Sequence, residues 1–257
     1  MDKASTEIFN NCLKAIQTGI NLVLNLFFPP RCSFCSNIMD WSSRNEEVVC
    51  PDCLVQTSFV DTQSCIHCGK SLEKQSSCSC GLDSQKLYYD KVYSACEYEG
   101  ITREGLLDFK FSGRKELARV FAWFIIKKLQ MTNEKTFDII ISVPIHKTSF
   151  KERRYNQSEL IAEHIAKYYS KQLVKNNLIK TKETLMQSKL NKNDRSQNIK
   201  DAFEVVLKDE VKGKNILLID DILTTGATVN ECSKVLKQNG AKQIIVATVA
   251  TGKVLNN

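Results

Sequence analysis

The residues best suited to chemistry lie in one stretch, Asn215 to Val229, which reads NILLIDDILTTGATV. Two adjacent carboxylates, Asp220 and Asp221, follow an uninterrupted apolar run. Carboxylates accept hydrogen bonds from hydroxyl groups or bind a divalent cation, and a glycine turn at the start of a helix offers free N–H groups to a phosphate. The pattern predicts a ligand with a phosphate beside vicinal hydroxyls, such as a ribose 5-phosphate. The candidate phosphate residues are Thr224, Thr225, Gly226, Ala227 and Thr228.

The element that must position this stretch is a buried strand. The run from Asn215 to Ile219 has the length and the continuous apolar character of a strand covered on both faces of a parallel sheet. We expect it to end at the acid pair, at the carboxyl edge where open α/β sheets bind ligands. Two other phosphate-binding loops are excluded, because no lysine follows Gly226 as a Walker A loop requires and the chain has no GxGxxG motif.

The second half of the chain predicts alternating strands and helices, which is typical of an α/β domain. We expect three regions: an N-terminal helical segment at 1–30, a cysteine-rich module at 31–86 and an α/β domain at 87–257. Within the last region, apolar runs predict strands at 91–98, 137–144, 215–219 and 243–249, and helical periodicity predicts helices at 100–111, 114–130, 155–169 and 228–239.

A basic loop is expected after the strand at 137–144. Lys147, Lys151, Arg153 and Arg154 give it four positive charges against one negative charge. Paired guanidinium groups bind oxygen-rich anions bidentately, so Arg153 and Arg154 suit a pyrophosphate group. The alternative is a solvated basic loop, which would be the better interpretation if the acid pair were absent.

The most basic part of the chain is 171–200, with eight basic and two acidic residues. Its segment 188–200 is polar and turn-prone, as in a mobile lid or a binding loop, although an exposed connector has the same composition. We take Gln187, Arg195 and Asn198 as its candidate ligand contacts.

The cysteines of the N-terminal part have metal-ligand spacing. Two CxxC pairs separated by fourteen residues are followed by a CxxC and a CxC pair. Thiolates in this arrangement predict one or two structural Zn²⁺ sites, paired either sequentially or in interleaved fashion, and redox-active thiols are the alternative. The eight candidate ligands are Cys32, Cys35, Cys50, Cys53, Cys65, Cys68, Cys78 and Cys80.

Composition limits the class of protein. A chain of 257 residues allows two domains, and its 42% hydrophobic and 25% charged residues exclude a disordered protein. The formal net charge is +7, but 31–80 has more acidic than basic residues, so the cysteine module suits a phosphate backbone poorly. The apolar run at 19–28 is too short to span a bilayer and lacks a cleavage site. We expect reduced thiols and a cytoplasmic protein without a membrane span.

The order of these parts resembles a known family. A cysteine-knuckle module is joined to SVPI at Ser142, RRYNQ at Arg153, QSKLNKNDRSQN at Gln187 and LLIDDILTTGAT at Leu217. Together they resemble the ComF family, and within it the ComFC-type late competence proteins. The resemblance extends from 26 to 251.

This resemblance implies a type I phosphoribosyltransferase-like fold, a parallel sheet flanked by helices, with a small zinc-binding module before it. It implies that the acid pair meets the ribose, that 224–228 holds the 5-phosphate, and that 142–157, with Asn156 and Gln157, holds the pyrophosphate of phosphoribosyl pyrophosphate and Mg²⁺. Relatives usually carry glycine where this chain has Arg154. That arginine is strained if the position needs a positive φ, and adds a phosphate ligand if it does not.

Three functions fit these features. The first is a binding module of the DNA-uptake machinery, with phosphoribosyl pyrophosphate, incoming single-stranded DNA and a helicase-type competence protein as partners. The second is an active phosphoribosyltransferase, in which Arg153 and Arg154 stabilise developing charge but no nucleophile can be named. The third is a ligand-sensing regulator. The resemblance favours the first.

Overall fold

The computed structural model describes residues 28–39, 49–72, 78, 86–183 and 199–252. By its contacts the chain divides into two units, Met1–Leu54 and Val55–Asn257, and each is described by itself. Most of the helical segment expected at 1–30 lies outside the described residues, as does most of the basic segment expected at 188–200.

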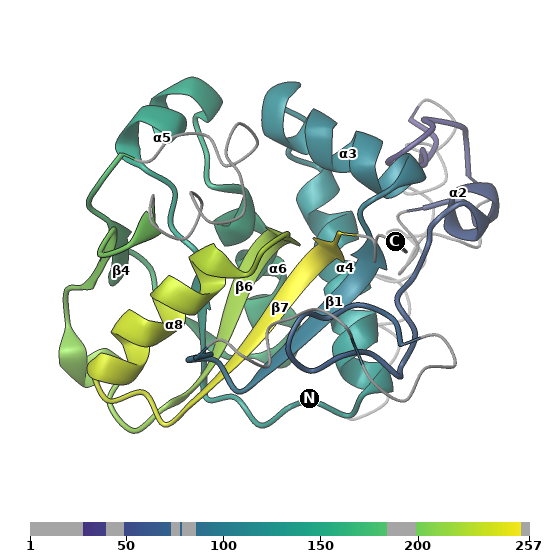
Figure 1. Ribbon diagram of the computed structural model, residues 1–257. Coiled ribbons are helices and arrows are strands. Elements are labelled where there is room, and N and C mark those ends of the chain that lie inside the picture. Colours follow the sequence, from purple (N-terminus) through teal and green to yellow (C-terminus); the bar gives the residue numbers. More distant parts are fainter. Residues whose placement is uncertain (1–27, 40–48, 73–77, 79–85, 184–198, 253–257) are drawn as a thin grey trace, which may run out of the picture. The chain divides into compact units, whose positions relative to one another are not determined.

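A five-stranded parallel sheet forms the centre of the unit Val55–Asn257, in the order β1-β7-β6-β2-β3 (Figure 1). The predicted parallel sheet is therefore confirmed. The strands are β1 (Lys91–Glu97), β2 (Ile139–Ser142), β3 (Gln172–Leu173), β6 (Asn215–Leu223) and β7 (Gln243–Thr251).

Both faces of the sheet are covered, which explains why its central strands are apolar throughout. Helices α4 (Leu117–Met131) and α6 (Gln157–Tyr169) pack on one face. Helix α8 (Ala227–Gln238) packs on the other, together with an antiparallel pair, β4 (Leu178–Lys180) and β5 (Phe203–Val205). Alternate residues of β6 accordingly enter different cores, and all four of its residues from Ile216 to Ile219 are fully buried.

After β2 and after β6 the chain crosses opposite faces of the sheet. Helix α6 connects β2 to β3 across one face, whereas α8 connects β6 to β7 across the other. Since β2 and β6 are neighbours, we expect a crevice between their carboxyl ends, because open α/β sheets bind ligands at such a switch point. Short helices α3 (Gly100–Phe111) and α5 (Lys147–Arg153) lie at this end of the sheet (Figure 1).

Two details differ from the expectation. Strand β6 continues through the acid pair to Leu223, because β7 runs beside it far enough to pair Leu223 with Thr251. The basic loop after β2 contains the helix α5, whose start is capped by the His146 ring, which accepts from the Thr148 N–H. Among the described residues, no helix combines the length and apolar character needed to cross a bilayer.

Candidate functional site

The acid pair lies in the second half of β6, beside the first turn of α6. Asp220 Oδ1 accepts a hydrogen bond from Ser158 Oγ at 3.0 Å and another from the Asp221 N–H at 2.9 Å. Asn156 caps α6 through the Ser158 N–H, and its Nδ2 donates to the Val143 carbonyl at 3.0 Å. These bonds join the end of β2, the start of α6 and the carboxylates of β6 at the crevice between the two strands.

The two carboxylates differ in their surroundings. Burial and the neighbouring Asp221 charge raise the pKa of Asp220 to about 7, although the Asp221 N–H, Lys110 and Ser158 act against the shift. Asp221 Oδ2 instead contacts Lys110 Nζ at 2.7 Å. Lys110 comes from the last turn of α3, more than a hundred residues earlier in the chain. The sequence gives no signal for this ion pair, because a lysine in the last helical turn is common for helix-dipole reasons alone.

The predicted phosphate loop links β6 to α8. Gly226 has a φ of +76° and stands at the N-terminus of α8, so a side chain there would be strained. Thr225 Oγ1 accepts from the Ala227 N–H at 3.4 Å, whereas Thr224 is exposed. Thr228 lies in the first turn of α8. The loop therefore presents a helix start and threonine hydroxyls beside the acid pair, which suits an anion.

The second predicted anion loop follows β2. Arg154 is exposed and ends α5 with a φ of +63°, the left-handed conformation that glycine adopts without strain. Of the two alternatives for this position, the structure therefore has the strained backbone. Arg153 turns inward, with Nη1 3.4 Å from Gln157 Oε1 and its guanidinium 5.4 Å from the centre of the Phe111 ring.

Three further candidates fall outside the described residues. Gln187, Arg195 and Asn198 are not placed by the structure, and neither is most of the segment 188–200. Their assignment as ligand contacts stays a prediction.

The cysteines form two groups in sequence order, not interleaved. In the first, the four sulfur atoms lie within 4.8 Å of one another, and the Cys50 N–H donates to Cys32 Sγ at 3.3 Å. Burial raises the pKa of Cys32, but the N–H groups of Cys50, Cys35 and Phe34 outweigh it and lower the pKa to about 7. These N–H groups stabilise the Cys32 thiolate, whereas burial raises the pKa of Cys50 and Cys53. The closeness of the four sulfur atoms is what fits a structural zinc site, where a bound ion would itself favour the thiolates. The group is Cys32, Cys35, Cys50 and Cys53.

The second group is described for three of its four predicted ligands. Cys65, Cys68 and Cys78 have their sulfur atoms within 4.8 Å of one another, and the His67 N–H donates to Cys65 Sγ at 3.4 Å. Cys80 lies outside the described residues. Three clustered thiols and a fourth nearby in sequence suit the same tetrahedral zinc chemistry.

Comparisons with known proteins agree with both parts of the chain. Residues 23–81 match the double zinc ribbon domain, and residues 156–254 match the phosphoribosyl transferase domain. Competence protein F of Haemophilus influenzae is 28% identical over 86% of this chain and 96% of its own length. Competence protein ComFC of Streptococcus pneumoniae is 29% identical over 78% of this chain and 87% of its own. The chain belongs to the ComF family.

Other ComF-like relatives carry a different description. The DNA utilization protein YhgH of Shigella flexneri is 27% identical over 84% of this chain and 87% of its own length. Among solved structures, a purine phosphoribosyltransferase from Pyrococcus horikoshii aligns with 54% of this chain and 85% of its own at 14% identity, with a TM-score of 0.34. A glutamine phosphoribosylpyrophosphate amidotransferase from B. subtilis aligns at 19% identity and a TM-score of 0.33, but over only 26% of its length.

In this ComF-family chain the second cysteine group is bonded directly to the sheet. Thr251 Oγ1 donates to the Cys68 carbonyl at 3.0 Å, the Val92 N–H to the Ile66 carbonyl at 2.9 Å, and the Tyr89 hydroxyl to the His67 carbonyl at 2.7 Å. The same hydroxyl would lie 3.5 Å from a side chain at Gly226. The cysteine knuckle and the phosphate loop thus share Tyr89 as a neighbour, a link that sequence spacing does not reveal.

Proposed function

We propose that this ComF-family chain binds phosphoribosyl pyrophosphate with Mg²⁺ at the crevice between β2 and β6, as a component of competence-type DNA uptake. The observation that carries the proposal is the contact of Ser158 with Asp220, at 3.0 Å. This contact joins the first turn of α6, which follows the loop after β2, to the acid pair of β6, and it supports a single ligand that reaches both. The proposal also draws on the match to the phosphoribosyl transferase domain and on the competence names of the relatives.

Each part of the ligand has a chemically suitable partner. Asp220 and Asp221 accept hydrogen bonds from the ribose hydroxyls and are also the oxygen ligands that Mg²⁺ prefers. The start of α8, after Gly226, takes the 5-phosphate. Arg153 and Gln157 donate to the pyrophosphate. Bound Mg²⁺ would neutralise charge on the pyrophosphate oxygens.

The acid pair provides the first test. Asp221→Asn keeps the shape of the side chain but removes the charge that the ribose hydroxyls would contact. We expect titration calorimetry with phosphoribosyl pyrophosphate and Mg²⁺ to show an affinity about 100-fold lower, the effect of losing two hydrogen bonds to a charged acceptor. Asp209→Asn, at an exposed acid outside the site, is the matched control. Equal affinities for wild type and Asp221→Asn would contradict the proposal.

An active phosphoribosyltransferase is the second candidate, favoured by the match of residues 156–254 to that domain. Measuring pyrophosphate release in the presence of nucleobases, ammonia and glutamine separates the two. Tight binding without release supports a binding module, whereas release with one of these nucleophiles identifies a transferase.

The DNA part of the proposal draws on the names competence protein and DNA utilization protein, and on the basic segment 171–200. We propose that this segment contacts incoming single-stranded DNA in the cytoplasm, where a helicase-type competence protein would be the partner. The acidic cysteine module would take no part in holding the phosphate backbone.

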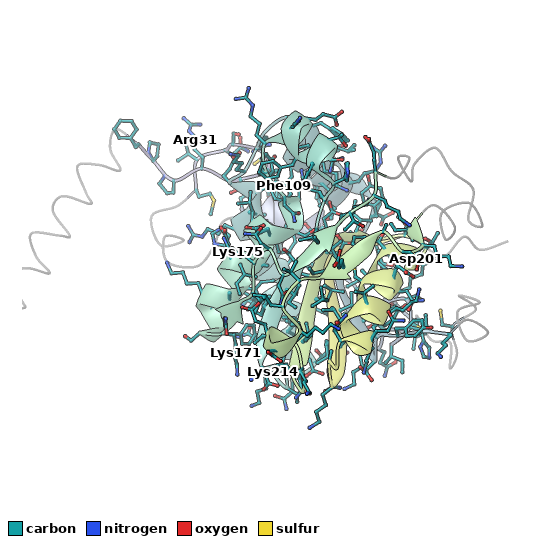
Figure 2. All side chains as sticks on the ribbon, turned by 90° about the vertical axis from the view of Figure 1, so that its left-hand side faces the viewer. Arg31, Phe109, Lys171, Lys175, Asp201 and Lys214 are labelled. Atoms are coloured by element: carbon teal, nitrogen blue, oxygen red, sulfur yellow. The ribbon has the colours of Figure 1, made fainter. Side chains whose placement is uncertain are left out.

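Neutralising three charges in that segment tests the DNA contact. Replacing Lys189, Lys192 and Arg195 by glutamine is expected to weaken single-stranded DNA binding and to reduce the slope of log affinity against log salt by about 2. Fluorescence anisotropy over a salt series measures both. The control triple, Lys135, Lys214 and Lys242 to glutamine, removes three exposed charges that lie outside the segment and just before strands, and Figure 2 labels Lys214 among them. If the two triples lose affinity equally, the segment has no special role.

A further inference from the structure

The last turn of α3 brings a lysine next to the acid pair. The proposed functions above give this lysine no role. Lys110 Nζ is 2.7 Å from Asp221 Oδ2, and its side chain is 19% exposed. An ammonium group has three N–H donors, and this contact needs only one of them. Lys110 can therefore hold Asp221 and still donate to a ligand bound beside it.

The end of α3 is fixed to the pyrophosphate loop, not to the phosphate loop. The Tyr155 hydroxyl donates to the Phe109 carbonyl, and the two rings lie 5.8 Å apart. The Phe111 ring stacks against the Arg153 guanidinium. Figure 2 labels Phe109 well above Lys171 and Lys214, which precede strands, so α3 ends on the side of the sheet where the strands have their carboxyl ends.

The same loop contains two donors that lack partners. Gln157 is 1% exposed, and within the described residues its Nε2 is buried without a hydrogen-bond partner. The same holds among these residues for Arg153 Nε. Buried donors in folded proteins almost always have a hydrogen-bond partner, so two unpaired donors beside each other indicate that an acceptor-rich ligand completes the site.

The charges around the acid pair indicate which kind of ligand can complete the site. The acid pair alone would repel an anion, but Lys110 and Arg153 supply two positive charges against the two carboxylates. We propose that Lys110 is a pyrophosphate-binding residue, which bridges Asp221 and the pyrophosphate group of the ligand while Arg153 and Gln157 donate from the other side. This rests on the proposed binding of phosphoribosyl pyrophosphate and adds the residue that selects the activated sugar over ribose 5-phosphate.

The test compares three probes by titration calorimetry: phosphoribosyl pyrophosphate, ribose 5-phosphate and pyrophosphate, each with Mg²⁺. Lys110→Met is expected to lower the affinity for phosphoribosyl pyrophosphate and for pyrophosphate by about 10- to 100-fold, the range for one charge-assisted hydrogen bond. The affinity for ribose 5-phosphate should change by less than about 3-fold, since this compound has no pyrophosphate group for Lys110 to contact. Lys110→Arg should retain most of the affinity, because it keeps the charge and the donors.

Lys127→Met, at an exposed lysine of α4, is the matched control, and thermal melting checks that every variant folds. If Lys110 only balances the charge of Asp221, Lys110→Met will change the affinities for phosphoribosyl pyrophosphate and ribose 5-phosphate by the same factor, and the inference is wrong. Unchanged affinity for phosphoribosyl pyrophosphate also overturns it. If wild type binds none of the three probes, the proposed function fails first, and the two failures are thereby distinguished.

Discussion

Cys68→Ser is expected to remove one equivalent of zinc and to lower the melting temperature of the protein by about 6–12 °C. The residue belongs to the cysteine group whose backbone is bonded to β1, to β7 and to Tyr89. Loss of the metal removes the constraint that holds the knuckle in shape, because structural zinc sites contribute their binding free energy to folding. The effect should therefore reach the sheet.

The size of the effect follows from the hydrogen bonds that the knuckle makes. Its Ile66, His67 and Cys68 carbonyls each accept one bond from the α/β part of the same unit. At about 1 kcal/mol per bond, their loss costs about 3 kcal/mol, and in a domain of this size each kcal/mol shifts the melting temperature by about 2–4 °C. A Cβ at Gly69 would clash with the side chains of Ser94 and Val92, so little space separates the knuckle from β1.

Native mass spectrometry and differential scanning calorimetry measure the two quantities. Cys32→Ser is the matched control, since it removes a thiolate of the same kind from the other cysteine group. It should also lose one equivalent of zinc, but leave the main transition within about 2 °C of wild type. Equal shifts in the two variants, or a zinc loss in Cys68→Ser without any shift, would show that the knuckle does not stabilise the sheet.

The central strands of the sheet were predictable because a strand buried on both faces has a long run of apolar residues. Asn215–Ile219 and Gln243–Thr251 are of this kind, and helix α3 has the predicted bounds, Gly100–Phe111. Short elements were missed because they contain no such long apolar run. Strand β3 has two residues and β4 three, too few for a period to be recognised.

Within the candidate site, local features were predictable and long-range partners were not. A glycine before a helix predicts a turn at that position, and Gly226 has a φ of +76° at the start of α8. The Lys110–Asp221 ion pair depends on where α3 ends in space, which no spacing in the sequence encodes. The same is true of Tyr89, which reaches both the knuckle and the phosphate loop.

A second long-range partner gives the last prediction. Lys128, in α4, is 3% exposed, and its ammonium donates to the carbonyls of Val60, at 3.1 Å, and Asp61. The Val60 N–H in turn donates to the Ala95 carbonyl of β1 at 2.9 Å. Lys128 thus fastens the segment that follows the first cysteine group to the edge of the sheet, a role that its position in an apolar helix does not suggest.

Lys128→Ala is expected to reduce the free energy of unfolding by about 2–5 kcal/mol. The change removes the ammonium donor from the buried Val60 carbonyl and the partly buried Asp61 carbonyl, and it removes the packed stem of the side chain. Release of a buried ammonium offsets part of this cost, since burial lowers the pKa of Lys128 to about 8. Urea denaturation measures the difference, with Lys127→Ala, at the exposed neighbouring lysine, as the control.

The pH dependence tests whether burial lowers the pKa of Lys128 in the folded protein. The pKa of Lys128 is about 8 in the folded protein, whereas a lysine in the unfolded chain keeps a value near 10.4. Between these values the unfolded state binds the extra proton, so wild type gains stability as the pH rises. The gap between wild type and Lys128→Ala should therefore widen from pH 8 to pH 10, by up to about 1.4 kcal/mol per unit. A gap that stays constant over this range would mean that the pKa of Lys128 is the same in the folded and unfolded states, so that burial does not lower it.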